Sequence, residues 1–173
     1  EELYLKTNCG QNSHMAIDYE LLLTKGITGV VEKIDTKLAS CKEESVPFLK
    51  ACRRCLMAVG VLSERYADTL LSLSEGEEGE KKEALLMMSR VCRRVPLNPA
   101  ESFIEAVQSV HFMTYALSLD PLRKWHQQFQ LGHPDRYLYP YYKKDVESGA
   151  ITKKEAQLIL DLLGILINMR VPS

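Results

Sequence analysis

The sequence predicts a mainly α-helical domain. Apolar residues recur every three to four positions through most of the chain, a spacing typical of helices that pack along one face. One segment, residues 125–131, alternates loosely between apolar and polar, so the chain is expected to hold at most one or two short strands. Of the 173 residues 46% are hydrophobic and 26% are charged, which is the composition of one soluble globular domain rather than of a disordered chain.

The first third of the chain predicts three helices. Residues 18–25 form a short helix that Gly26 stops, and residues 27–42 form a second, so that the two make an αα-hairpin. Residues 43–74 carry the longest helical pattern, and its apolar stripe contains Phe48, Leu49, Cys52, Leu56, Val59, Ser63, Tyr66 and Leu70.

A charged, glycine-containing segment follows at residues 75–82 and is expected to be a solvated loop. Residues 83–94 resume a helix, which Pro96 and Pro99 end because proline cannot continue a helical hydrogen-bond ladder.

Two later helices are apolar on nearly every side. Residues 100–119 leave only a thin polar stripe, and residues 158–167 are interrupted by a single acid, Asp161, and by Gly164. The second is too short to cross a bilayer, which takes ~20 apolar residues. A further helix at 137–148 lies between them. Two such helices are more than a lone domain of this size can enclose, so further chain is expected to pack over both.

Charge and cysteine usage limit the function classes. The 22 basic and 23 acidic residues give a net charge of −1, so nothing favours a nucleic-acid or acidic-membrane partner. Five cysteines are an odd number, and no leading signal peptide is recognisable, which indicates reduced thiols in the cytoplasm. The chain opens at Glu1 rather than Met and ends at Ser173, which suggests an excised piece of a longer protein.

Cys52 and Cys55 form a CxxC pair with two interpretations. A redox pair sits at a helix N-terminus, where the thiol pKa falls, and a zinc site needs a second Cys or His pair. Here both cysteines fall in mid-helix with no second pair, which favours buried, inert thiols, with a redox switch as the weaker hypothesis.

Other short motifs predict little chemistry. His14, His111, His126 and His133 show no metal-ligand spacing, and His111 is expected to be a core histidine. No glycine-rich phosphate loop occurs. Five arginines are interpreted as surface ion-pair partners rather than as a nucleic-acid surface: Arg53, Arg54, Arg90, Arg93 and Arg94.

Longer strings carry more information. Residues 92–96 read CRRVP, residues 99–108 read PAESFIEAVQ, and residues 131–142 read LGHPDRYLYPYY. In this order they resemble the N-terminal part of a glycyl radical enzyme of the pyruvate formate-lyase superfamily. The resemblance covers most of the chain and extends to Gly10, His14, Asp18, Tyr19, Glu20, Asp145, Gly149, Ile151, Thr152, Glu155 and Ala156.

The resemblance implies a ten-stranded α/β barrel encased in helices. This chain would supply mainly the helical casing, with one barrel strand expected at residues 128–131. In such enzymes a radical S-adenosylmethionine activase installs a radical on a protein glycine, which then passes to a cysteine in the barrel. The glycine and cysteine loops of the family are absent here, so no cofactor is expected in this piece, which alone should be inactive. The implied partners are the remainder of the barrel, the activase and a second copy in a homodimer.

The matched region departs from the family at His133, where an Arg is usual, and at Arg136, where a Gln is usual. This indicates a divergent branch outside the formate lyases. His14, with Asn12, corresponds to a position that faces the substrate in some dehydratase relatives, but the same loop could equally cap the following helix. Asp135 is expected to brace the barrel strand.

The sequence therefore supports two hypotheses about function. The first is a fragment of a glycyl radical lyase that in full length acts on a small metabolite, as a dehydratase, a decarboxylase or a lyase of C–C or C–N bonds. The alternative is a stand-alone helical binding or assembly module without catalysis.

Overall fold

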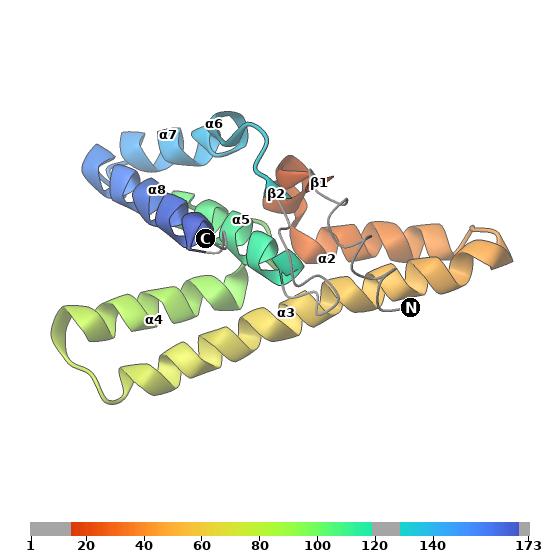
Figure 1. Cartoon of the computed structure of the whole chain (residues 1–173), viewed down its shortest axis with the longest axis horizontal. Coiled ribbons are helices and arrows are strands. Elements are labelled where there is room, and N and C mark those ends of the chain that lie inside the picture. The colour runs from red at the N-terminus through yellow and green to blue at the C-terminus, as the bar shows by residue number, and fades with distance from the viewer. Residues whose placement is uncertain (1–14, 119–128, 170–173) are drawn as a thin grey trace, which may run out of the picture.

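A computed structural model describes residues 15–118 and 129–169 (Figure 1). The elements run β1 (Met15–Ala16), α2 (Tyr19–Leu38), a short 3₁₀ helix η1 (Glu43–Ser45), α3 (Val46–Ser74), α4 (Gly79–Arg94), α5 (Phe103–Ser118), β2 (Phe129–Gln130), α6 (Pro134–Tyr137), α7 (Tyr139–Glu147) and α8 (Lys153–Asn168). The prediction of a mainly helical fold with short strands is confirmed.

α2 bends sharply at Gly26. Gly26 has φ 65° and ψ 178°, a conformation that only glycine adopts readily, and the peptide groups beyond it bond to the 96–97 segment. Ile27 N–H donates to the Pro96 carbonyl and Thr28 N–H to the Leu97 carbonyl, both at 3.0 Å. The predicted break at Gly26 is confirmed, but the αα-hairpin is wrong, because no loop separates the two halves (Figure 1).

α3 and α4 pack side by side as an extended hairpin, called here the α3–α4 arm (Figure 1). Small α3 residues, Gly60, Ser63 and Ala67, face the packed side, and the Ser89 hydroxyl of α4 donates to the Ala67 carbonyl at 2.8 Å. Small residues let two helix backbones approach closely. The predicted apolar stripe of α3 is therefore only partly right, since Phe48 and Tyr66 are exposed.

The charged loop is shorter than the predicted range 75–82. α4 already begins at Gly79, so only the first half of that range connects the two helices. Lys81 forms an ion pair with Glu77, one helical turn earlier in the sequence. The prediction placed residues 79–82 in the loop because this first turn of α4 holds no apolar side chain that would mark a helical pattern.

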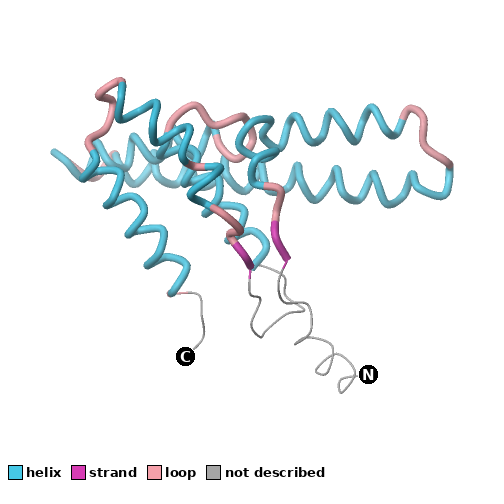
Figure 2. Tube along the Cα trace, turned by 90° about the horizontal axis from the view of Figure 1, so that it is seen from above, coloured by secondary structure: helices cyan, strands magenta, loops and turns pink. Residues whose placement is uncertain are grey.

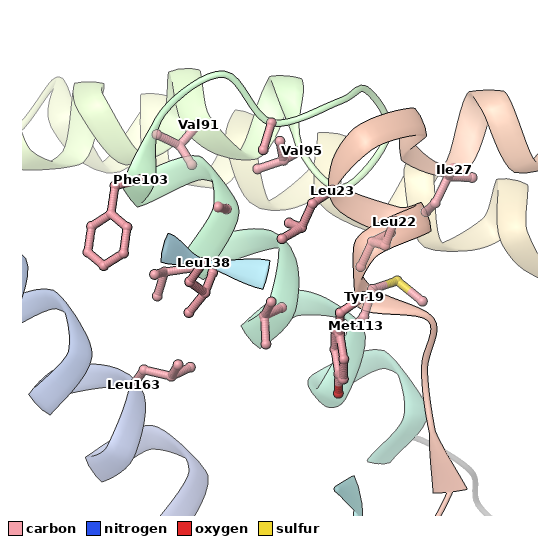
Figure 3. Close-up of a cluster of buried hydrophobic side chains, with 14 of the residues drawn as sticks. Tyr19, Leu22, Leu23, Ile27, Val91, Val95, Phe103, Met113, Leu138 and Leu163 are labelled. Carbon is pink, nitrogen blue, oxygen red and sulfur yellow. The ribbon is translucent and has the colours of Figure 1, made fainter. Parts of the chain in front are cut away.

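The hydrophobic core lies around α5 (Figure 3). α2, α4, α7 and α8 pack on it, and its buried residues are Phe103, Ala106, Val107, Ser109, Val110, Phe112, Met113 and Thr114. The expectation that further chain must cover α5 is wrong, because this chain encloses most of it. For α8 the expectation stays a prediction, since this helix exposes Leu158, Leu160, Leu162, Ile165, Leu166 and Met169.

β1 and β2 form a parallel pair, with Met15 opposite Phe129 and Ala16 opposite Gln130. Figure 2 shows the two strands projecting from one side of the helical layer. β2 confirms the described part of the strand predicted at 125–131, whose residues 125–128 lie outside the described part of the chain.

The described residues 129–169 contain three helices, α6, α7 and α8. One helix was predicted at 137–148. The structure has α7 there and a separate short helix, α6, directly before it, and Leu138 divides the two. α8 starts five residues before the predicted 158, at a capping box in which Thr152 Oγ1 accepts from Glu155 N–H at 3.2 Å and Glu155 Oε2 accepts from Thr152 N–H at 2.7 Å. Among the described residues no helix has the length and apolar character needed to cross a membrane.

Candidate functional site

The residues predicted to bind substrate, His14 and Asn12, lie outside the described residues. Cys52 and Cys55 lie inside α3, beyond its first turn but in its N-terminal half, and are free thiols. The prediction that both are buried is wrong: Cys52 is half-buried and Cys55 is exposed. This part of α3 lies beside α2, as the ion pair of Arg53 with Asp35 indicates, and Cys55 is on a face that α2 leaves open. His111 is half-buried in α5. Within the described ranges no group of three or more His, Cys, Asp or Glu residues could hold a metal ion.

The arginines predicted as ion-pair partners take that role at three positions. Arg53 Nε lies 2.8 Å from Asp35 Oδ1, and Arg93 Nη2 lies 2.7 Å from Asp68 Oδ1. Arg94 pairs with Glu101 at the start of the α5 region. All these side chains are partly or largely exposed, so each pair contributes about 0–1 kcal/mol.

The buried thiol of Cys92 is not an activated nucleophile. Burial raises the pKa of this thiol, an effect that the hydrogen bond from Gln108 Nε2 (3.9 Å to Sγ) only partly offsets. The thiolate is the reactive form of cysteine, and the raised pKa keeps Cys92 protonated at neutral pH. The Cys92 side chain therefore packs as a core residue.

The candidate site is the edge where the two strands leave the helical layer. Tyr19 follows β1 and Tyr137 follows β2, and their rings stack with centroids 5.0 Å apart and an interplanar angle of 24°. The Tyr137 hydroxyl donates to the Leu131 carbonyl at 2.8 Å, just beyond β2. The stacked pair therefore joins the exits of both strands.

The two phenols differ in their hydrogen bonding. Tyr19 is 4% exposed, and its hydroxyl has no hydrogen-bond partner among the described residues. Figure 3 shows its ring below Leu22 and Leu23 with the hydroxyl turned away from them. An unpaired buried hydroxyl costs about 1–3 kcal/mol, so it marks a position where an acceptor would be favourable.

Both phenols are neutral at physiological pH. Burial raises the pKa of Tyr19 to about 12. Burial also raises the pKa of Tyr137 above its usual value, with smaller contributions from the negative charges that Tyr19 and Asp135 would carry. A neutral phenol donates a hydrogen bond and does not act as a base, so the pair can position a group but cannot abstract a proton.

Asp135 does not brace the strand as predicted. Its side chain is 77% exposed in the first turn of α6, and its nearest charged partner is His133, whose Nδ1 lies 3.9 Å from Oδ1. The exposed Asp135 carboxylate is free to bond to water. The contact to the end of the strand is made by the hydroxyl of Tyr137 instead.

Asp145 is the charged group that the sequence analysis gave no role. It is buried in α7, and its Oδ2 accepts the Phe103 N–H at 2.7 Å, at the start of α5. A carboxylate at a helix N-terminus satisfies an unpaired N–H and interacts favourably with the helix dipole. The sequence of α7 gives no local sign of this role, because the helix holds two acids, Asp145 and Glu147, and only the contact with α5 distinguishes them.

A hollow of about 490 Å³ lies between the start of α5 and the helices α6, α7 and α8. Its walls are mostly apolar and aromatic, and the lining residues are Phe103, Pro134, Asp135, Leu138, Tyr139, Tyr142, Lys153, Ala156, Gln157 and Leu160. The arrangement positions strands and helices and, within the described residues, presents no activated nucleophile or metal site.

Comparison with known proteins identifies this arrangement. The family described as pyruvate formate lyase-like matches residues 7–172. The isethionate sulfite-lyase of Bilophila wadsworthia is 31% identical over 156 residues, which are 86% of this chain and 19% of that enzyme. A crystal structure of a glycyl radical enzyme from Archaeoglobus fulgidus is 34% identical with a TM-score of 0.78, over 86% of this chain and 20% of that one.

The fold likeness extends further than the sequence likeness. The B12-independent glycerol dehydratase from Clostridium butyricum has a TM-score of 0.80 at 24% identity, over 97% of this chain and 23% of that one. The chain thus spans about a fifth of the length of the relatives that it matches.

Proposed function

Because this chain belongs to the pyruvate formate-lyase-like family of glycyl radical enzymes, we propose that it is the strand-holding helical part of a glycyl radical lyase that acts on a small metabolite. In full length such an enzyme would be a dehydratase, a decarboxylase or a lyase of C–C, C–N or C–S bonds. The observation that carries the proposal is the parallel β1–β2 pair, held at its exits by Tyr19 and Tyr137 within a chain that superposes on glycyl radical enzymes.

The proposed contribution of this chain is geometric. α5 and the helices around it fix β1 and β2 in register, and the stacked tyrosines hold the segments that leave both strands. Barrel enzymes need the strands fixed to well below an ångström, because misplacement of reacting groups by 1 Å can cost 10²-fold in rate. The radical glycine and the attacking cysteine would come from the remainder of the polypeptide.

Alone, the chain is proposed to be inactive. The radical would be installed on the full-length enzyme by a radical S-adenosylmethionine activase, in the cytoplasm and without oxygen. A homodimer and the substrate-facing role of His14 and Asn12 belong to the same proposal, since both depend on the assembled barrel.

A segment exchange tests the proposal. The matched segment of Bilophila wadsworthia isethionate sulfite-lyase is replaced by this chain, and the hybrid is activated anaerobically with the activase of that enzyme. We expect the hybrid to show a glycyl radical signal in electron paramagnetic resonance. The isolated chain and the relative with the segment deleted should show none.

Two outcomes contradict the proposal. The first is a radical signal on the isolated chain. The second is a deleted relative that folds and is activated as well as the hybrid. The stand-alone binding module would be favoured instead if the hybrid failed while the isolated chain captured an unrelated, defined partner.

A further inference from the structure

α8 exposes a regular apolar line along one face. Leu158, Leu162, Ile165 and Met169 follow one another at spacings of four, three and four residues, and between 49% and 75% of each is exposed. These four residues are called the α8 seam. Spacings of four and three alternate in the contact line of helices that pack with knobs into holes, so the seam has the geometry that receives another helix.

The opposite face of α8 is apolar as well. Ala156 and Leu163 are buried against the core, and Ile159 and Ile167 pack at its edge. From Leu162 to Met169 the helix contains no charged residue. A helix that is apolar on all sides belongs in the interior of a large protein or in a membrane, and α8 does not meet the requirements for a membrane span.

Position and length indicate where the occupant comes from. Figure 2 shows α8 projecting from the helical layer on the side from which β1 and β2 project. The relatives carry about four-fifths of their length outside the segment that this chain matches. A charge-free contact line is typical of permanent interfaces rather than of transient ones, which are more polar.

We propose that a helix from the part of the enzyme outside this segment packs along the α8 seam and closes the casing beside the strand pair. The inference rests on the proposed function, and it names the surface through which this chain would contact the remainder of the enzyme. Leu166 flanks the seam and would lie at the border of the same interface. Leu160 lies on the other face of α8, where it lines the hollow with Ala156.

Charge substitutions on exposed residues test the contact without damaging the fold. The seam variant is Leu162→Lys with Ile165→Glu. The matched control is Val61→Lys with Leu73→Glu, at α3 positions that are 54% and 56% exposed and face away from the α3–α4 contact. In the isolated chain both variants should keep the helical circular dichroism and the thermal midpoint of the parent, because surface substitutions change stability little.

The two variants should differ once the rest of the enzyme is present. In the hybrid with isethionate sulfite-lyase, we expect the seam variant to lose the radical signal and the soluble yield, and the α3 variant to keep both. As a second measurement, the tagged chain is co-expressed with the relative that lacks its matched segment. The parent chain and the α3 variant should capture it, and the seam variant should not.

The outcomes separate the two proposals. A parent hybrid that gains no radical contradicts the proposed function, and the capture measurement then decides the seam proposal by itself. Equal performance of the seam and α3 variants contradicts the seam proposal and leaves the function standing. Sedimentation that shows the parent chain as a dimer and the seam variant as a monomer, with an unaffected hybrid, would assign the seam to a second copy and overturn the proposal.

Discussion

Tyr19 carries a buried hydroxyl group that no described residue pairs with, whereas the Tyr137 ring stacked on it has a satisfied hydroxyl. The two residues thus form a natural matched pair. Their rings have the same chemistry and share one contact, and they differ in the hydrogen bond and in burial, since Tyr137 is only half-buried.

Replacing each tyrosine by phenylalanine should therefore change stability in opposite directions. Tyr137→Phe leaves the Leu131 carbonyl without its donor and should lower the free energy of unfolding by about 1 kcal/mol. Tyr19→Phe removes an unpaired polar group and should raise it by about 1 kcal/mol. Urea unfolding of the isolated chain measures both, and a loss of stability in Tyr19→Phe would show that the hydroxyl is already satisfied.

Tyr19 also predicts how stability depends on alkaline pH. Its pKa is about 10 in an unfolded chain and is raised by burial to about 12 in the fold. Between these values the unfolded chain gives up the proton and the folded chain keeps it, so stability that is complete below pH 10 is lost as the pH rises toward 12. The slope for one group is about 1.4 kcal/mol per pH unit, and Tyr19→Phe should reduce the measured slope.

The bend in α2 depends on one glycine. A Cβ on Gly26 would lie 2.5 Å from the Leu97 carbonyl oxygen and from the Asn98 carbonyl carbon, both backbone atoms that cannot move aside cheaply. Its positive φ adds strain for any other residue.

Gly26→Ala should therefore cost at least about 2 kcal/mol of stability. The control is Gly76→Ala in the turn between α3 and α4, where a new Cβ meets no atom within 4 Å. Thermal unfolding of both variants checks the prediction. An equal midpoint for the two proteins would mean that the bend does not depend on Gly26.

The sequence predicted the elements that depend on neighbouring residues alone. Gly26 broke its helix where predicted, and the long period of residues 43–74 gave α3 to within three residues. The start of α8 was missed although Thr152 and Glu155 have the spacing of a capping box, because the apolar pattern begins only later.

The candidate site was less predictable because it depends on distant contacts. β1 has two residues, too few to show an alternating pattern, and its register is set by β2. The stacking of Tyr19 on Tyr137 and the bond from Phe103 to Asp145 join segments far apart in the chain. The exposure of Cys55 depends on which face of α3 receives α2, a contact between distant segments that the ion pair of Arg53 with Asp35 marks.

The core around α5 buries more apolar surface than the contact between α3 and α4. Large apolar side chains such as Phe103, Leu23 and Val110 fill the core around α5. The contact between α3 and α4 is made mainly by small or polar buried residues, among them Ser63, Ala67, Ser74 and Ser89, which bury little apolar surface.

Hydrogen exchange should reveal this difference. Amides in the outer part of the arm, residues 70–85, should exchange well before those of α5, because local opening there exposes less apolar surface. Mass spectrometry of peptic fragments from the isolated chain measures both regions. Equal protection of the two regions would show that the arm unfolds only together with the core.

The strand pair also imposes an order in time on the growing chain. Met15 pairs with Phe129, 114 positions later (129 − 15). At a synthesis rate of 5–20 residues per second, β1 is synthesised about 6 to 23 s before its partner strand. The helices α2 to α5, all encoded between the two strands, can assemble in that interval, so that β2 arrives at a layer that already holds β1. Until β2 has been made, the edge of β1 has no partner strand and can pair with another extended segment.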